Sequence, residues 1–232
     1  MPVIPPAIFA IGKNYAAHAA EMGGDVPERP VVFMKNPASV IGNGEEIHIP
    51  LICAEPPNED GSPRRQVDYE GELAVIIGKN CRDVSEDEAL NFVSSYAVAN
   101  DVSARWWQKK GSGGQFIRGK SFDTFCPLSE PVAAEAISNP QSLSIKTIVS
   151  GEVMQQGSTR DMIFPVNKLI SELSRGMTLS AGTVILTGTP PGVGAGRNPP
   201  RFLQHGDMVE IIIEGVGSLK NPVVDDSFSF NG

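Results

Sequence analysis

The sequence predicts a β-rich α+β fold, because short apolar segments with β-forming residues outnumber segments with helical spacing. The apolar runs at 73–77 and 184–186 are only a few residues long, and clusters of glycine, proline and asparagine interrupt the chain between such runs. With 232 residues and 41% hydrophobic content, the chain is long enough for one sizeable core, so we expect a single domain over residues 1–232.

In the first quarter of the chain, short apolar runs alternate with turn residues. A proline-rich and polar stretch at 50–66 is expected to be a surface loop, not a linker between domains. The elements expected before it are a strand at 8–11, a turn at 12–15, a short helix at 16–22, and strands at 31–35 and 47–49.

The middle of the chain combines strands with one capping signature. Residues 73–77 form an almost unbroken apolar run that predicts a buried strand. Ser85 and Glu88 have the spacing of a capping box, which predicts a short helix ending near Ser95. Residues 96–102 then predict a second strand.

The second half of the chain predicts one hairpin, one helix and three strands. The hairpin joins 143–149 to 152–156 through Ser150 and Gly151. Pro165 begins a helix that Gly176 ends, with apolar residues at helical spacing between them. The remaining strands are expected at 184–186, 207–214 and 216–224.

Three carboxylates fall at the ends of the two central strands. Glu70 and Glu72 are two residues apart, so in an extended segment they point to the same face. Asp101 follows the neighbouring predicted strand and can reach the same point. Acids are rarely buried side by side without a positive partner. The pattern therefore suggests an all-oxygen site for Mg²⁺, Mn²⁺ or Ca²⁺, against the alternative of solvated acids at strand ends.

Composition narrows the partners and the compartment. The net charge is −8 and the basic residues are scattered, so we expect no nucleic-acid or membrane partner. Three separated cysteines without CxxC spacing argue against a disulfide framework or zinc site and favour a reducing compartment. We expect a cytoplasmic protein, or a mitochondrial matrix protein if a transit peptide has been removed.

The glycine-rich run at 186–194 raises the alternative of a nucleotide-binding loop. Such a loop requires a helix that begins directly after it, with its N-terminus facing the phosphate. Asn198, Pro199 and Pro200 exclude a helix at that place. We therefore do not expect nucleotide binding.

Five segments of the chain carry a recognisable pattern. They are 11–22 (IGKNYAAHAAEM), 67–78 (VDYEGELAVIIG), 100–105 (NDVSAR), 119–127 (GKSFDTFCP) and 186–194 (LTGTPPGVG). In this order, and over nearly the whole chain, they resemble the fumarylacetoacetate hydrolase family. Among its members the chain looks most like the small acylpyruvase and oxaloacetate-handling ones. The resemblance implies a mixed β-sandwich roll, a Mg²⁺ cofactor and a homodimer.

The resemblance also implies roles for individual residues. His18 and Glu21 match a catalytic dyad on a lid helix at about 15–23, with His18 as general base. Without the resemblance, a surface pair would be the simpler interpretation of that spacing. Lys120 matches a catalytic cation, and the expected substrate contacts are Lys35, Arg105, Gln108 and Thr189.

These roles predict an enzyme that acts on a small 2-oxo acid, whose carboxylate and keto oxygens can both bind one divalent ion. Our first expectation is a Mg²⁺-dependent hydrolase that cleaves a C–C bond in acylpyruvates such as acetylpyruvate or fumarylpyruvate. The alternatives are an oxaloacetate decarboxylase or keto–enol tautomerase, and a 2-hydroxyhepta-2,4-diene-1,7-dioate isomerase. An inactive binding protein is the alternative outside enzymes.

Overall fold

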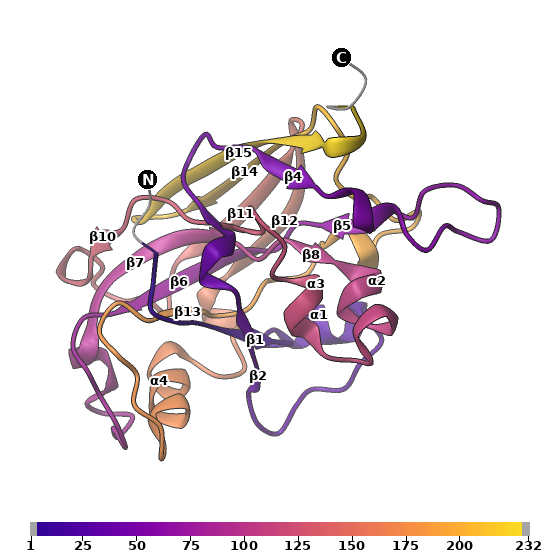
Figure 1. The fold of residues 1–232 in the computed structure, drawn as a ribbon. Coiled ribbons are helices and arrows are strands. Elements are labelled where there is room, and N and C mark those ends of the chain that lie inside the picture. The colour runs from indigo at the N-terminus through magenta and orange to yellow at the C-terminus, as the bar shows by residue number, and fades with distance from the viewer. Residues whose placement is uncertain (1–3, 229–232) are drawn as a thin grey trace.

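The computed structural model describes residues 4–228 and has the β-rich α+β architecture that the sequence predicts. Two larger sheets and two short strand pairs contain most of the regular secondary structure of the described chain, and helices are few (Figure 1). Strands from the first half of the chain dominate one large sheet, and strands from the second half dominate the other.

The larger sheet has six strands in the order β10-β7-β6-β13-β1-β2. Only β1 and β13 run parallel, and all other neighbours are antiparallel. Its strands are β1 (Ile8–Gly12), β2 (Val31–Lys35), β6 (Gly71–Ile77), β7 (Val93–Asn100), β10 (Val132–Ala133) and β13 (Val184–Leu186).

The second sheet has five strands in the order β12-β11-β14-β15-β4, in which only β15 and β4 are parallel. Ser150 and Gly151 both have positive φ angles at the β11–β12 turn, as a two-residue hairpin requires. The strands are β4 (Ile47–Ile49), β11 (Ser144–Val149), β12 (Glu152–Ser158), β14 (Met208–Ile213) and β15 (Gly217–Asp225).

The main core lies between the two large sheets. β6 contacts β11, and β7 contacts β14 and β15. The side chains on these inner faces are apolar and closely packed, and Leu73, Val75 and Ile145 are fully buried. A smaller apolar cluster around Ala74, Ala97 and Leu186 lies apart from this main core. Burial of apolar surface on this scale is the main favourable contribution to folding.

Two short strand pairs complete the sheets. β3 (Val40–Ile41) pairs with β9 (Cys126–Pro127), and β5 (Val67–Asp68) pairs with β8 (Ser103–Ala104). The β5–β8 pair continues the β6–β7 pair, but two residues on each side of the ladder separate the two pairs. These residues are 69–70, between β5 and β6, and 101–102, between β7 and β8.

The helices are short, and none between residues 4 and 228 combines the length and apolarity needed to cross a membrane. α1 to α3 lie at the same end of the molecule, whereas α4 packs near the 3₁₀ turn at Ala89–Phe92 (Figure 1). The helices are α1 (Ala16–Glu21), α2 (Arg105–Gln108), α3 (Phe116–Gly119) and α4 (Val166–Ser174).

Most expected elements are confirmed, and two expectations are wrong. The helix expected after Ser85 is absent. The Ser85 hydroxyl bonds to the Glu88 side chain at 3.4 Å instead of capping a backbone N–H, and only a 3₁₀ turn follows. Val93 already belongs to β7, because pairing with β6 takes precedence over the weak local helical pattern. That strand also ends at Asn100, so Asp101 lies just beyond it.

The position of Leu73 at the centre of the core leads to a stability prediction. Leu73→Ala should lower the free energy of unfolding by about 2–5 kcal/mol, because it leaves a cavity between two sheets. Leu90→Ala is the matched control, since Leu90 is 42% exposed, and its cost should stay below about 1 kcal/mol. Urea unfolding of both variants measures the difference. Equal losses would mean that Leu73 is not part of a closely packed core.

Candidate active site

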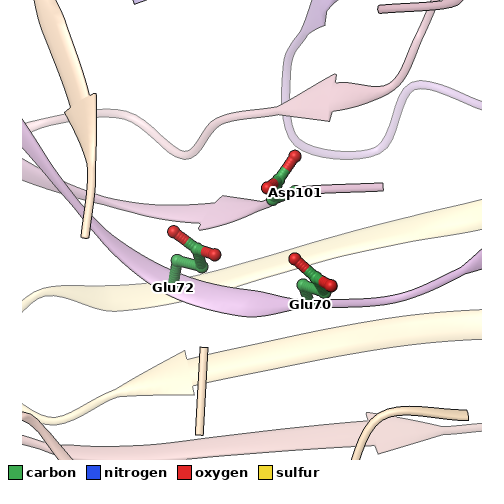
Figure 2. A group of neighbouring side chains, drawn as sticks. All are labelled: Glu70, Glu72 and Asp101. Atoms are coloured by element: carbon green, nitrogen blue, oxygen red, sulfur yellow. The ribbon is translucent and has the colours of Figure 1, made fainter. Parts of the chain in front are cut away.

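Glu70, Glu72 and Asp101 converge where the central strand pair is interrupted. One carboxylate oxygen of each residue lies within 4.8 Å of the others, and all three residues are buried. Figure 2 shows Glu70 and Glu72 on the same side of one strand, beside Asp101 from the next. The register Gly71↔Asn100 places the start of β6 next to the end of β7. The sequence prediction that these acids meet is therefore realised in the geometry.

The backbone at the break keeps these acids on the face opposite the core. A Cβ added at Gly71 would lie 2.3 Å from Thr147 Oγ1 and 3.1 Å from Ile211 Cγ2, so this position is pressed against the second sheet. The neighbours Glu70 and Glu72 must then point the other way. The Glu70 N–H donates to Asn100 Oδ1 at 3.0 Å, and the Asp101 N–H donates to the Glu70 carbonyl at 2.9 Å.

Two buried lysines pair with the acids. Lys120 Nζ lies 2.6 Å from Glu70 Oε2 and 2.5 Å from Asp101 Oδ2, and it also donates to the Ser103 hydroxyl. Lys35 Nζ lies 2.6 Å from Asp101 Oδ1 and is fully buried. Lys35 was expected to contact substrate, but in the structure it pairs with an acidic neighbour, Asp101, and it does not line the cavity described below.

Arg105 forms the third cationic contact. Its guanidinium bridges Asp68 and Glu70 at 2.8 and 2.6 Å, and it donates to Gln108 Oε1 at 3.0 Å. Asp68 also accepts the N–H groups of Gly194 and Ala195. Arg105 and Gln108 are thus held rigidly beside the acids, where substrate contacts were expected.

Electrostatics distinguish the acids from one another. Burial alone raises the pKa of Glu70, but the charges of Lys120 and Arg105 outweigh burial and hold the pKa of Glu70 well below its usual range. Burial raises the pKa of Glu72 far above its usual value, and the negative charges of Asp101 and Glu70 raise it further. Glu72 is therefore the acid that lacks a positive partner.

The donor set fits a hard divalent cation. Among the described residues, no cationic side chain lies within ion-pair distance of Glu72, whose Oε2 accepts only the Gly188 N–H at 2.7 Å. When all four carboxylates, Asp68 included, are ionised, as ion binding requires, they face three cations, which leaves one net negative charge in the buried cluster. Oxygen ligands and a residual negative charge suit an ion such as Mg²⁺, Mn²⁺ or Ca²⁺.

His18 and Glu21 of α1 form the expected pair. His18 Nδ1 lies 3.3 Å from Glu21 Oε2, and Glu21 also accepts the Gly192 N–H at 3.0 and 3.1 Å. Because a carboxylate only accepts, this contact places the imidazole proton on Nδ1 and leaves Nε2 able to accept a proton. The pair therefore has the form of an oriented general base.

The glycine-rich segment after β13 binds carboxylates with its backbone. The N–H groups of Gly188, Gly192 and Gly194 donate to Glu72, Glu21 and Asp68, respectively. Gly192 has a φ of +106°, and a Cβ there would lie 2.1 Å from the Met154 carbonyl, so only glycine fits. No α-helix lies between this segment and Met208, so the helix that a nucleotide-binding loop requires is absent at this place.

Thr189 lies in the same segment and is already hydrogen-bonded. Its hydroxyl donates to the Gly71 carbonyl at 2.9 Å and accepts from Gln155 Nε2 at 2.8 Å. Gln155 Oε1 accepts the Gly71 N–H at 3.0 Å. Thr189 is thus fixed at the wall of the site, and its contact with a substrate carboxylate stays a prediction.

A cavity of about 230 Å³ opens over these groups. The cavity is lined by His18 of α1, by Glu72 of β6 and Glu70 directly before β6, and by Arg105, Gln108, Lys120 and Thr189. Of the other expected site residues, Glu21 and Asp101 contact the lining residues His18 and Lys120, and Lys35 contacts Asp101. The remaining lining residues of the cavity are Ile11, Gly12, Lys13, Met22, Gly23, Gly24, Phe33, Lys109 and Phe116.

Three buried polar residues that support the site were not predicted. Asp68 holds Arg105, Gln155 holds Thr189, and Asn14 bonds through its side chain to Phe164 and Thr187. Asp68 carried a signal, because it shares the alternation of Glu70 and Glu72. For Asn14 and Gln155 the partners are 34 to 173 residues away, and no local pattern indicates them.

Comparisons with known proteins show the family of the chain. The family profile described as Fumarylacetoacetate (FAA) hydrolase C-terminal matches residues 7–224. The chain is 45% identical over 219 residues to oxaloacetate tautomerase YisK of Bacillus subtilis, covering 93% of this chain and 69% of that protein. It is 42% identical over 221 residues to the mitochondrial oxaloacetate tautomerase fahd2 of Xenopus laevis, covering 95% and 66%. The chain thus spans about two thirds of the length of these curated relatives.

A solved structure gives a further comparison. The 2-hydroxyhepta-2,4-diene-1,7-dioate isomerase from Mycobacterium marinum superposes with a TM-score of 0.80 at 37% identity, covering 97% of this chain and 76% of that one. The similarity therefore extends through the whole fold and includes the strands that carry the acids.

The high pKa of Glu72 leads to a prediction for metal binding. A bound divalent ion needs Glu72 ionised, so binding should release a proton wherever Glu72 is protonated in the metal-free protein, and affinity should rise with pH. Glu72→Gln should lower Mn²⁺ or Mg²⁺ affinity at least tenfold and remove the proton release. Calorimetry in buffers of different ionisation enthalpy measures both effects.

Glu59→Gln is the matched control for this experiment, because Glu59 is exposed in the 50–66 loop. It should leave both the affinity and the proton count unchanged. Metal binding that is equally tight in Glu72→Gln would exclude Glu72 as a ligand.

Proposed function

Because this chain belongs to the fumarylacetoacetate hydrolase family, we propose that it is a metal-dependent enzyme that interconverts the keto and enol forms of a small 2-oxo acid such as oxaloacetate. The observation that carries the proposal is that one cavity contains an oriented base, His18, beside an acidic triad with an unbalanced negative charge. Two relatives with more than 40% identity are named oxaloacetate tautomerases, which supports this choice of reaction.

We propose Mg²⁺ as the cofactor, with Mn²⁺ or Ca²⁺ as alternatives. Glu70, Glu72 and Asp101 would hold it, because they offer three buried oxygen ligands within reach of one ion. When bound, the ion would act as a Lewis acid that polarises the 2-oxo group.

The proton transfer belongs to His18. In the keto form, the C3–H bond breaks, Nε2 of His18 takes the proton, and the electron pair forms the C2–C3 double bond as negative charge moves to the C2 oxygen. Return of that proton from the imidazolium to the C2 oxygen completes the enol and restores neutral His18. Glu21 holds the imidazole through Nδ1 and stabilises its charged form. Gly192 fixes Glu21 in turn, so the base is oriented before substrate arrives.

Neighbouring groups would orient the 2-oxo acid. Lys120 lines the cavity, and burial by itself lowers its pKa, but the charges of Asp101 and Glu70 raise it and keep the ammonium protonated. That ammonium attracts negative charge on the oxygens of the substrate. Gln108 and Thr189 present polar groups at the same wall. Phe33 and Phe116 also line the cavity and pack edge to face with ring centroids 5.5 Å apart, an apolar pair that would reduce the access of water to the substrate.

C–C bond hydrolysis of an acylpyruvate, our first expectation from the sequence, is the second candidate. The same observation favours it, because His18 and Glu21 could take a proton from water instead of from C3. Isomerisation of a diene-dioate requires the same proton transfers, and a solved relative is named for that reaction. Decarboxylation of oxaloacetate needs no base, so the dyad gives it no particular support.

A homodimer and a cytoplasmic location, with the mitochondrial matrix as the alternative, stay predictions. An unpaired strand edge at β2, which exposes Val32 and Met34 to 44% and 37%, supports the expectation of a dimer.

A substrate panel with Mg²⁺ tests the reaction. We expect the enzyme to accelerate loss of enol-oxaloacetate above the spontaneous rate, and His18→Ala to lower kcat about 10²- to 10⁴-fold. The products from oxaloacetate, acetylpyruvate and fumarylpyruvate must be identified, because loss of absorbance alone does not separate tautomerisation from cleavage. Cleavage of acetylpyruvate with slow tautomerisation would favour the hydrolase instead.

His48→Ala is the matched control, since His48 lies in β4 and pairs with Asp226 away from the cavity. Both histidine variants should unfold at similar denaturant concentrations. If His18→Ala reduced decarboxylation as strongly as the reactions that need a base, the dyad would have another role, such as shaping the cavity.

A further inference from the structure

Four cationic side chains line the cavity, and two of them are already neutralised. Arg105 pairs with Asp68 and Glu70, and Lys120 pairs with Glu70 and Asp101. The other two are Lys13 and Lys109. Within the described part of the chain, neither has a carboxylate at ion-pair distance or a hydrogen-bond acceptor for its ammonium group. Lys109 is exposed at the rim, whereas Lys13 is half-buried.

The backbone holds Lys13 in an unusual conformation. Its φ of +57° lies in the left-handed region, which residues with a Cβ adopt rarely. The next residue, Asn14, fixes this turn, because its side chain donates to the carbonyls of Phe164 and Thr187 and accepts the Phe164 N–H. The direction in which Lys13 leaves the backbone is therefore set by buried hydrogen bonds, and such strain points to a role for the side chain.

Gly24 makes room for the end of that side chain. A Cβ added at Gly24 would lie 2.5 Å from Lys13 Nζ and 3.1 Å from its Cε. Lys13 therefore extends towards the turn that follows α1, and it lines the cavity together with His18 and Met22. Its ammonium therefore lies next to the segment that follows α1, the helix that carries His18, and it is not within ion-pair distance of Glu70, Glu72 or Asp101.

Charge balance indicates what this ammonium would meet. The buried cluster has one net negative charge, so a divalent ion would make it singly positive, and one substrate carboxylate would neutralise it. A second carboxylate on the substrate would then have no partner there, because the cations around the acids are already neutralised. Lys13 is the remaining half-buried cation in the cavity.

We propose that Lys13 binds the distal carboxylate of a dicarboxylic 2-oxo acid and so selects dicarboxylates over monocarboxylates. The proposal rests on the proposed function and names the substrate class. Lys13 acts on binding and on the placement of C3 next to His18. The chemistry at C3 does not involve it.

The test compares two substrates with the same carbon skeleton, enol-oxaloacetate and its 4-methyl ester, in the presence of Mg²⁺. Lys13→Met should raise KM for oxaloacetate about 10- to 100-fold, the loss expected for one charged hydrogen bond. KM for the ester should change less than about twofold, because the ester has no distal charge. Lys13→Arg should recover most of the oxaloacetate affinity, since arginine retains the charge.

Two further variants separate local contact from general effects. Lys110→Met removes the same charge from an exposed position outside the cavity, and it should alter neither KM. Gly24→Ala should displace the flexible Lys13 ammonium and raise KM for oxaloacetate selectively, with little loss of stability. Denaturant unfolding of each variant checks that the fold is intact.

Each outcome decides the proposal. Equal changes for both substrates in Lys13→Met would mean that Lys13 supports the turn after α1, and no change for either would mean that it does not contact substrate. Both results overturn the proposal.

Calorimetry measures how tightly oxaloacetate and the ester bind to the wild type and to Lys13→Met. Because binding needs no turnover, this measurement tests the role of Lys13 independently of the proposed reaction. Binding that prefers oxaloacetate and loses this preference in the variant supports Lys13, even if neither compound turns over and the proposed function fails. Equal wild-type affinity for both compounds would overturn the role of Lys13 while leaving the proposed reaction standing.

Discussion

The structure depends on keeping several like charges together in the interior. Removing a carboxylate from water costs several kcal/mol, and Glu70, Glu72 and Asp101 are all buried within reach of one another. Two lysines and an arginine, fixed by separate elements, offset most of this repulsion. The break between β5–β8 and β6–β7 creates the space for these groups, and the five-stranded sheet closes the opposite face. The fold is thus arranged around one incompletely balanced charge.

Backbone amides bind carboxylates that the cationic side chains leave without a full positive partner. The glycine-rich segment donates N–H groups to Glu72, Glu21 and Asp68, acids that belong to three different parts of the site. Backbone amides stabilise negative charge without adding a full positive charge of their own. Glu72 can therefore remain available to a cation, and Glu21 can orient His18. A single loop in this way connects the metal-ligand candidates to the candidate base.

The arrangement also explains how related proteins can carry names for different reactions. Tautomerisation, hydrolysis and isomerisation of 2-oxo acids all need a stabilised negative charge on oxygen and a proton moved near C3. The acidic triad and His18 are suited to these shared demands. The cavity is also lined by residues of α1, the turn at Lys13 and the short helices α2 and α3, which would contact the rest of the proposed substrate. Substrate choice is therefore expected to depend on the walls more than on the acids.

The sequence by itself determined the β-rich fold, most strand positions and the acids at the strand ends, because these follow from local alternation and from short apolar runs. It also contained the resemblance that identified His18 and Glu21. The tertiary structure alone decided that Lys35 pairs with Asp101, that Gly188 binds Glu72 across 116 residues, and that Lys13 enters the cavity unpaired. It also replaced the helix expected after Ser85 with a strand that begins at Val93. The physical reason is the same in each case: contacts between distant segments compete with local preference, and their partners leave no periodic signal in the chain.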